Sequence, residues 1–258
     1  MSQIVIYGGG TFNHVRCHLS LAVPAFGETA RKIKQELLLA DLRLTRMAWD
    51  ASRIVTNEDL AQDIKKVITN PYVKYIVMSA AICDFEGTID GVGSSKDSAR
   101  LETSEGANTI NIVPSPKIIK YIKQERPDIY LVGFKTTHGA TPVEQAEKAI
   151  NMGVDLVLAN DLKTRSNLLV TSDTVITSSR SECVKALCET IRKKQSRIIY
   201  ENDHRVCVQL PTHFYINQNE AFDLAKAIVK PKYEVTHGGW ESKIEGAFWL
   251  YKVKGKTR

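Results

Sequence analysis

Short apolar runs alternate with helical patterns over residues 4–194, and this alternation restricts the possible folds more than any other feature. The apolar runs are IVIY, LRLTRM, KYIVMSAA, IYLVGF, DLVLAN and DTVITSS. Most of them lack a polar face, as expected for parallel strands that are buried on both sides. The helical patterns cover residues 28–40, 57–70, 115–125, 142–153 and 181–194. We therefore predict an α/β fold with a Rossmann-like, doubly wound and mostly parallel sheet.

The ends of two helices and the limits of the domain can also be predicted. Asn57 and Ser115 are expected N-caps, with Pro116 at the first position of its helix. Residues 86–108 interrupt the alternation with Gly, Ser, Asp and Lys, so we expect a long loop that acts as a mobile flap. The alternation fades after about residue 195. We expect one main domain over residues 1–195 and a C-terminal extension over residues 196–258.

Composition limits the classes of function and the cellular setting. The formal charge of +6 and the pI of about 9.0 fit an anionic ligand, either a nucleotide or a nucleic acid. The five cysteines are odd in number and form no CxxC pair, which indicates neither a disulfide framework nor a zinc site. We expect no protein metal-ligand set. No apolar run approaches the roughly 20 residues that span a bilayer, and no signal pattern precedes the first strand. We expect a soluble, cytoplasmic protein without a membrane partner.

Three glycines follow the first apolar run, in the sequence IVIYGGGT. Glycine at the end of a strand lets backbone N–H groups approach phosphate oxygens closely. However, GGGT is not GxGxxG, and the pattern GxxxxGK[ST] is absent from the chain. The residues alone leave two interpretations of Gly8, Gly9 and Gly10 open, an anion-binding loop and a plain tight turn.

Seven short segments occur in a characteristic order. They are GGGT followed by VR (Val15, Arg16), then SAAICDF, RLETSEG, PSPKII, VGFK and DLVLANDL. In order and spacing, from about residue 4 to about residue 192, the chain resembles the phosphopantothenate–cysteine ligase family (phosphopantothenoylcysteine synthetases), as a divergent member. That family catalyses the second step of coenzyme A assembly from pantothenate.

The resemblance implies a reaction and its co-substrates. CTP or ATP activates a carboxylate as an acyl-nucleotide, and an amine then displaces the nucleotide to form an amide. Mg²⁺ is implied as the cation that shields the triphosphate. Small-molecule acid and amine substrates and a homodimer are implied as partners.

The resemblance also implies a set of site residues. Arg100 matches the basic residue of the family's flap, although it could simply be a solvated loop cation. Arg16 and Ser20 fall at catalytic positions, and we expect His18, Asn160 and Asp161 near the substrate. His14 and His18 could equally be structural histidines at a helix start. The implied nucleotide-binding residues are Gly8, Gly9, Gly10, Thr11, Ala80, Ala81, Asp84, Pro116, Lys117, Ile118, Phe134, Lys135 and Lys148.

Departures from the family pattern concern the acid substrate. Ser20 stands where the family has an asparagine that handles the acyl-nucleotide. Ala22, Val23 and Pro24 replace a Ser-Ser-Gly helix start that receives the substrate phosphate. The nucleotide half of the pattern is better kept, which leaves open a relative that uses a different acid or amine.

Two other classes of protein remain open. A dinucleotide-dependent oxidoreductase would share the sheet, but it should carry GxGxxG and an acidic residue after the second strand. A non-catalytic nucleotide- or nucleic-acid-binding protein could use the C-terminal tail, where lysines alternate with Trp240, Phe248, Trp249 and Tyr251. Because the family forms homodimers, we favour an interface or a cap for this tail over nucleic-acid binding.

Overall fold

The chain divides into two compact units, Ser2–Val184 and Lys185–Arg258. The computed structural model describes residues 3–89, 91–92, 95–106, 109–210, 217–229, 233–240 and 247–257. The division falls inside helix α5 (Arg180–Gln195), whereas the expected boundary after residue 195 lies at the end of the same helix.

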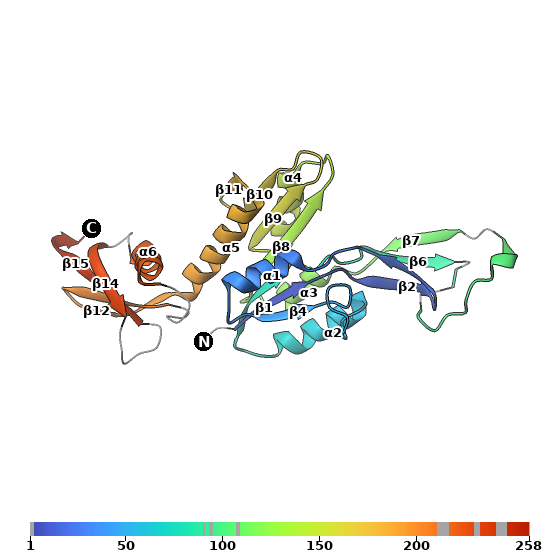
Figure 1. Cartoon of the computed structure of the whole chain (residues 1–258), viewed down its shortest axis with the longest axis horizontal. Helices are drawn as coiled ribbons and strands as arrows, with labels where there is room; N and C mark the ends of the chain where they lie inside the picture. Colours follow the sequence, from blue (N-terminus) through green and yellow to red (C-terminus); the bar gives the residue numbers. More distant parts are fainter. Residues whose placement is uncertain are drawn as a thin grey trace. The chain divides into compact units, whose positions relative to one another are not determined.

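A seven-stranded sheet forms the centre of the first unit, in the order β11-β10-β9-β8-β5-β1-β4 (Figure 1). Five neighbouring strands, β4, β1, β5, β8 and β9, run parallel. Strand β10 pairs antiparallel with β9, and β11 pairs antiparallel with β10 at the edge of the sheet. The predicted fold class is therefore confirmed. The order β4-β1-β5-β8-β9 places a topological switch point between β1 and β5, where ligands of such sheets commonly bind. The strands are β1 (Gln3–Gly8), β4 (Asp41–Leu44), β5 (Val73–Met78), β8 (Tyr130–Thr137), β9 (Leu156–Asp161), β10 (Asn167–Val170) and β11 (Val175–Ser178).

Helices cover both faces of this sheet. Leu60 and Ile64 of α2, Ile122 of α3 and Ala146 of α4 join one buried core with alternate residues of the strands. Helix α1 packs on the opposite face, where Ala30 faces Gly8 of β1. This two-sided burial explains why the strands are apolar throughout. The helices are α1 (Glu28–Glu36), α2 (Asn57–Ile68), α3 (Ile118–Glu125) and α4 (Pro142–Asn151).

Both predicted N-caps are wrong by a short distance. The N-cap of α2 is Thr56, which forms a capping box with Asp59. Helix α3 begins at Ile118 after Lys117, so Pro116 lies before the helix. The side chains of Asn57 and Ser115 instead bind other segments near the ligand edge of the sheet. Asn and Ser are common N-cap residues, which is why the sequence suggested caps here. The sequence does not show that the partners of these side chains lie in distant segments.

Two antiparallel ribbons project from the sheet (Figure 1). Strands β2 (Phe12–Arg16) and β3 (Leu19–Ala22) form one, and β6 (Phe85–Ile89) and β7 (Ile110–Pro114) form the other. The helix start expected around His14 and His18 is therefore a β-hairpin. The expected flap loop begins with strand β6, and its described part includes the short 3₁₀ helix Thr103–Glu105. The ribbons pack closely, since a Cβ on Gly87 would lie 2.9 Å from Val15.

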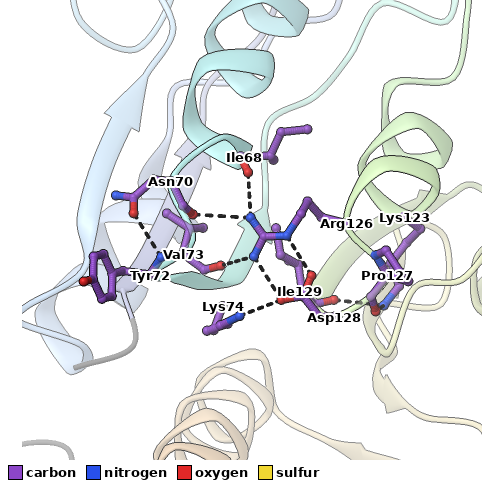
Figure 2. A network of polar contacts seen from close by, with 10 residues as sticks. All are labelled: Ile68, Asn70, Tyr72, Val73, Lys74, Lys123, Arg126, Pro127, Asp128 and Ile129. Atoms are coloured by element: carbon purple, nitrogen blue, oxygen red, sulfur yellow. Dashed lines mark hydrogen bonds and ion pairs between the residues drawn. The ribbon is translucent and has the colours of Figure 1, made fainter.

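Arg126 lies at the end of α3 and stabilises the end of the sheet where its parallel strands begin (Figure 2). Its guanidinium donates to the carbonyl oxygens of Ile68 and Val73 at 2.6 and 3.1 Å. It also pairs with Asp128, which Lys74 contacts at 2.7 Å. These charged partners hold the pKa of the Asp128 carboxyl below its ordinary range. Arg126 thereby joins the ends of α2 and α3 to the start of β5.

Arg126→Ala should destabilise the first unit by roughly 2–4 kcal/mol, because several charge-assisted hydrogen bonds to partly buried carbonyl groups are lost together. Urea unfolding monitored by circular dichroism measures this loss. Lys74→Ala is the matched control: it removes only an exposed ion pair to Asp128, worth about 1 kcal/mol or less. Equal losses in the two variants would contradict this account of the network.

The second unit contains a four-stranded antiparallel sheet in the order β12-β13-β15-β14 and the helix α6 (Gln218–Val229). Phe248 and Trp240 pack with α6. Trp249 follows Phe248 in the same strand, so its side chain lies on the opposite face of the sheet. The centre of its ring lies 3.9 Å from Cζ of Arg205. Part of the aromatic tail, residues 241–246, lies outside the described residues. The strands are β12 (Arg197–Glu201), β13 (Arg205–Gln209), β14 (Tyr233–Trp240) and β15 (Ala247–Thr257).

Over the described residues, no helix combines the length and the apolar character needed to cross a bilayer.

Candidate active site

A cleft of about 540 Å³ opens at the carboxyl ends of β5, β8 and β9. Its walls come from the turn after β5, the start of α3, one side of α4 and the first residue of α5. Most of the lining residues are apolar. The lining residues are Val23, Pro24, Ala25, Thr29, Met78, Ser79, Ala80, Ala81, Ile82, Cys83, Asp84, Ser115, Pro116, Lys117, Ile118, Ile119, Gly133, Phe134, Lys135, Thr136, Gln145, Lys148, Ala149, Met152, Asn160 and Arg180.

The glycine turn after β1 closes the switch point between β1 and β5 with protein backbone. The N–H of Ala81 donates to the carbonyl oxygen of Gly9, and the N–H of Thr11 donates to that of Ala81, at 2.9 and 3.0 Å. The N–H of Gly10 donates to the carbonyl oxygen of Ala25 at 2.7 Å. The N–H groups of Gly10 and Thr11 are thus bonded to protein, and the cleft opens one strand further along, between β5 and β8.

Close packing explains why glycine is needed at the end of β1. A Cβ on Gly10 would lie 1.9 Å from the carbonyl oxygen of Val23, and one on Gly8 would lie 2.3 Å from the Cβ of Ala30. Gly9 has φ of +100°, which L side chains rarely adopt. Close packing therefore accounts for these glycines, and their role in binding a nucleotide stays a prediction.

A buried polar network fixes the turn that forms the floor of the cleft. The hydroxyl of Thr11 donates to Asn57 at 2.6 Å and accepts from the N–H of Cys83 at 2.9 Å. Asn57 donates to the carbonyl oxygen of Cys83 at 2.7 Å. Asn13 of β2 donates to Ser115 at 3.1 Å and so links the ribbon to the start of α3. These bonds make the floor rigid before any ligand binds.

The charged groups of the cleft are mainly cations. Its described lining contains four, Lys117, Lys135, Lys148 and Arg180, and a single carboxylate, Asp84. Asp84 pairs with Lys117 at 2.5 Å. The remaining positive charge favours an anionic ligand.

Arg180 is half-buried in the lining of the cleft. Its Nη2 donates to the hydroxyl of Thr29 at 3.2 Å, and its Nη1 lies 3.5 Å from Oδ1 of Asn160. The guanidinium lies 5.8 Å from the ring centre of Phe134. Burial lowers the pKa of Arg180 from its ordinary value, although an arginine stays charged at neutral pH.

Ten of the residues expected at the site from the sequence line this cleft. They come from five separate segments, which the fold brings together at the carboxyl ends of the strands. They are Ala80, Ala81, Asp84, Pro116, Lys117, Ile118, Phe134, Lys135, Lys148 and Asn160. Their roles in binding a nucleotide or a substrate remain predictions.

The other expected residues lie outside the lining. Gly8, Gly9, Gly10 and Thr11 lie behind the floor. Arg16 is only 6% exposed, and its guanidinium donates to the carbonyl oxygens of Val15 and Ile89 at 2.8 and 2.9 Å. Its side chain therefore joins the two ribbons.

Ser20, His18 and Arg100 lie on the ribbons and the flap. The hydroxyl of Ser20 is 2.9 Å from Nδ1 of His14. His18 and Arg100 are exposed. Their catalytic and substrate-binding roles stay predictions.

Asp161 organises its own loop and is buried. Its carboxylate accepts from the N–H groups of Gly139 and Thr164 at 2.7 and 2.8 Å and from the hydroxyl of Thr137 at 2.8 Å. These bonds, led by that of the Thr164 N–H, hold the pKa of Asp161 below its ordinary range. Thr137 lies on β8, so the carboxylate also joins the ends of β8 and β9.

Asp161→Asn should lower the urea midpoint at pH 7, because an amide nitrogen would face N–H donors. The wild-type carboxylate has a depressed folded-state pKa. Its contribution is therefore complete above the unfolded value of about 3.9 and is lost as the pH falls through the folded value. The difference in urea midpoint between the wild type and Asp161→Asn should therefore become smaller below about pH 4. Urea unfolding at pH 7 and at pH 3 measures this difference, and an unchanged difference would refute this role of the charge.

Sequence reasoning missed Arg180, Thr29 and Thr136. A signal for Arg180 was present, since it follows the sixth apolar run by one residue. Strand β11 runs in the same direction as β9, so its carboxyl end meets the same edge of the sheet. Thr29 lies inside a helical pattern that gives no sign of ligand contact.

The fold and the cleft define a Rossmann-like α/β protein with a cationic ligand cleft at the carboxyl ends of its parallel strands. The model of the DNA/pantothenate metabolism flavoprotein C-terminal domain family matches residues 36–202. That match covers more than half of the chain, which therefore belongs to this family. The resemblance stated from the sequence is confirmed at the family level.

A curated relative shares part of this region. The coenzyme A biosynthesis bifunctional protein CoaBC of Thermococcus kodakarensis is 31% identical over 115 residues, which cover 43% of this chain and 27% of that protein. The chain thus matches about a quarter of the length of this relative.

Solved structures share the fold at lower identity. The DNA/pantothenate metabolism flavoprotein from Streptococcus pneumoniae has a TM-score of 0.64 and 22% identity, covering 75% of this chain and 100% of that one. The C-terminal domain of a CoaBC protein has a TM-score of 0.54 and 16% identity, covering 74% and 93%. A Cab2 variant in complex with phosphopantothenate-cysteine has a TM-score of 0.50 and 14% identity, covering 73% and 87%.

Proposed function

We propose that this protein is a nucleotide-dependent, amide-forming ligase of the phosphopantothenate–cysteine type. The observation that carries the proposal is the cleft, which combines a mostly apolar lining with three cations beyond the Asp84–Lys117 pair. Membership of the family, and a neighbour whose name records a phosphopantothenate-cysteine complex, support the same reaction class.

The proposed reaction has two steps, each of which uses the charge of the cleft. A carboxylate oxygen of the acid bonds to the α-phosphorus of CTP or ATP, and pyrophosphate leaves. The amine nitrogen then bonds to the acyl carbon, the nucleoside monophosphate leaves, and the nitrogen loses a proton. Lys135, Lys148 and Arg180 would stabilise the negative charge of the phosphates and the leaving groups. Ala80, Ile118 and Phe134 would contact the nucleoside.

A divalent cation fits this cleft only together with the nucleotide. Over the described residues, no group of three His, Cys, Asp or Glu side chains could hold a metal ion, and Asp84 is the one carboxylate of the described lining. Mg²⁺ typically binds through substrate phosphates with one or two carboxylates. Mg²⁺ would shield the charge of the triphosphate and would be held mainly by its phosphates, since Asp84 pairs with Lys117.

The acid substrate is the second question, and one observation favours a relative with a different acid or amine. Val23 and Pro24 line the cleft where the family places hydroxyl groups for the substrate phosphate.

The direct test incubates the protein with CTP or ATP, Mg²⁺, phosphopantothenate and cysteine, and measures pyrophosphate and the amide product. Pyrophosphate release with other acids or amines, but not with this pair, would favour the alternative. If none of the tested pairs of acid and amine gave pyrophosphate, that result would contradict the ligase proposal.

We also propose that the protein is a homodimer, as the family resemblance implies. Light scattering coupled to gel filtration tests this directly. A mass near the 28.8 kDa of the single chain at micromolar concentration would contradict it.

A further inference from the structure

We infer that Arg180 is the residue that binds a phosphate group in the cleft, in place of the glycine turn. The inference deepens the proposed function and rests on it only for the choice of phosphate compounds. The N–H groups of Gly10 and Thr11 already donate to the carbonyl oxygens of Ala25 and Ala81. A phosphate in this cleft therefore needs donors from elsewhere.

The position of Arg180 suits this role. Thr29, Asn160 and Phe134, from three other elements, surround its guanidinium and hold it in the wall of the cleft. A guanidinium has five N–H donors, of which these contacts use two. The remaining donors can form the paired bonds that arginine makes with phosphate oxygens.

The charge of Arg180 also needs an anion. Its hydrogen-bond partners, Thr29 and Asn160, are neutral, and no ion pair with an acidic residue occurs for Arg180 over the described residues. Arg43 and Arg126 differ, because each pairs with aspartate. Even partial burial of a cation without a counter-charge is costly, and a bound anion would offset that cost.

The neighbouring charges favour phosphate over a singly charged group. Lys135 and Lys148 line the same cleft, while the charge of Asp84 is neutralised by Lys117. Three cations around one cavity match the charge of a polyphosphate or a phosphomonoester dianion. The source is either the triphosphate of the nucleotide or the phosphate of the acid substrate.

Calorimetry on the full chain distinguishes these sources. The ligands are CTP, ATP, phosphopantothenate and inorganic tripolyphosphate, together with cytidine, adenosine and pantothenate, which lack phosphate. The proteins are the wild type, Arg180→Gln, Arg180→Lys, and the control Arg53→Gln, which removes an exposed arginine outside the cleft. Thermal unfolding of each variant checks that it is folded.

We expect Arg180→Gln to weaken binding of at least one phosphate compound 10- to 100-fold and to leave its unphosphorylated counterpart unchanged. Arg180→Lys should recover part of the loss, and Arg53→Gln should bind as the wild type. A loss for CTP or ATP identifies the triphosphate, and a loss for phosphopantothenate identifies the acid.

Two results would overturn the inference. One is unchanged affinity for every phosphate compound, including tripolyphosphate. The other is an equal loss for a compound with and without phosphate, which indicates a structural role. If the wild type binds neither nucleotide nor phosphopantothenate, the proposed function fails, and the tripolyphosphate titration alone decides the role of Arg180. In that case, absence of tripolyphosphate binding to the wild type overturns the inference as well.

Discussion

Gly10→Ala is expected to destabilise the first unit severely. The new Cβ would lie 1.9 Å from the carbonyl oxygen of Val23 and 2.9 Å from the backbone nitrogen of Ala25. Backbone atoms cannot move aside as a flexible side chain can, so the turn must separate from residues 23–25. We expect a cost of roughly 4 kcal/mol or more, a large part of the stability of a domain.

Urea unfolding followed by circular dichroism measures this cost. Gly239→Ala is the matched control, because a Cβ there meets no atom of the described residues within 4 Å and the residue does not have a positive φ. That variant should stay within about 0.5 kcal/mol of the wild type. A Gly10→Ala protein as stable as the control would show that the turn is not packed against residues 23–25 as described.

Lys135→Met is expected to weaken binding of CTP or ATP by about 10- to 100-fold and to preserve the fold. Lys135 lies at the end of β8 and lines the cleft. Loss of one charge-assisted contact to phosphate costs roughly 1.5–3 kcal/mol, and each 1.4 kcal/mol is a factor of ten in affinity. Methionine keeps most of the volume of the side chain, so stability should change little.

Calorimetric titration with each nucleotide and Mg²⁺ tests this expectation. Lys120→Met is the matched control, since Lys120 is an exposed lysine of α3 that does not line the cleft. Raising the salt concentration should reduce the difference between wild type and Lys135→Met, because screening weakens the lost attraction. Equal affinities in Lys135→Met, Lys120→Met and the wild type would place the phosphates away from β8.

Most of the main sheet was predictable because its signals are local. The apolar runs that became β1, β5, β8 and β9 are buried on both faces, and this burial leaves a continuous pattern in the sequence. Strands β2, β3 and β10 were missed. They contain only four or five residues, and pairing with a neighbouring strand defines them more than their own composition does.

The candidate site was predictable in part. The segments SAAICDF, PSPKII and VGFK all reach the cleft, because each begins at or near the carboxyl end of a strand or the start of a helix at the same edge. Asp161 was expected near the substrate, yet its carboxylate is bonded to its own loop. A sequence shows that a carboxylate follows a strand, but it does not show which donors surround it.

The sequence by itself determined the order of strands and helices, the parallel sheet and the family, because these depend on short-range patterns and motifs. The tertiary structure alone decided which groups remain available for a ligand. The N–H of Gly10 is bonded to Ala25, and Arg180 reaches Thr29 across 151 positions of the chain. Such contacts join segments that are distant in sequence, and only the packed fold decides whether a donor faces protein or the cleft.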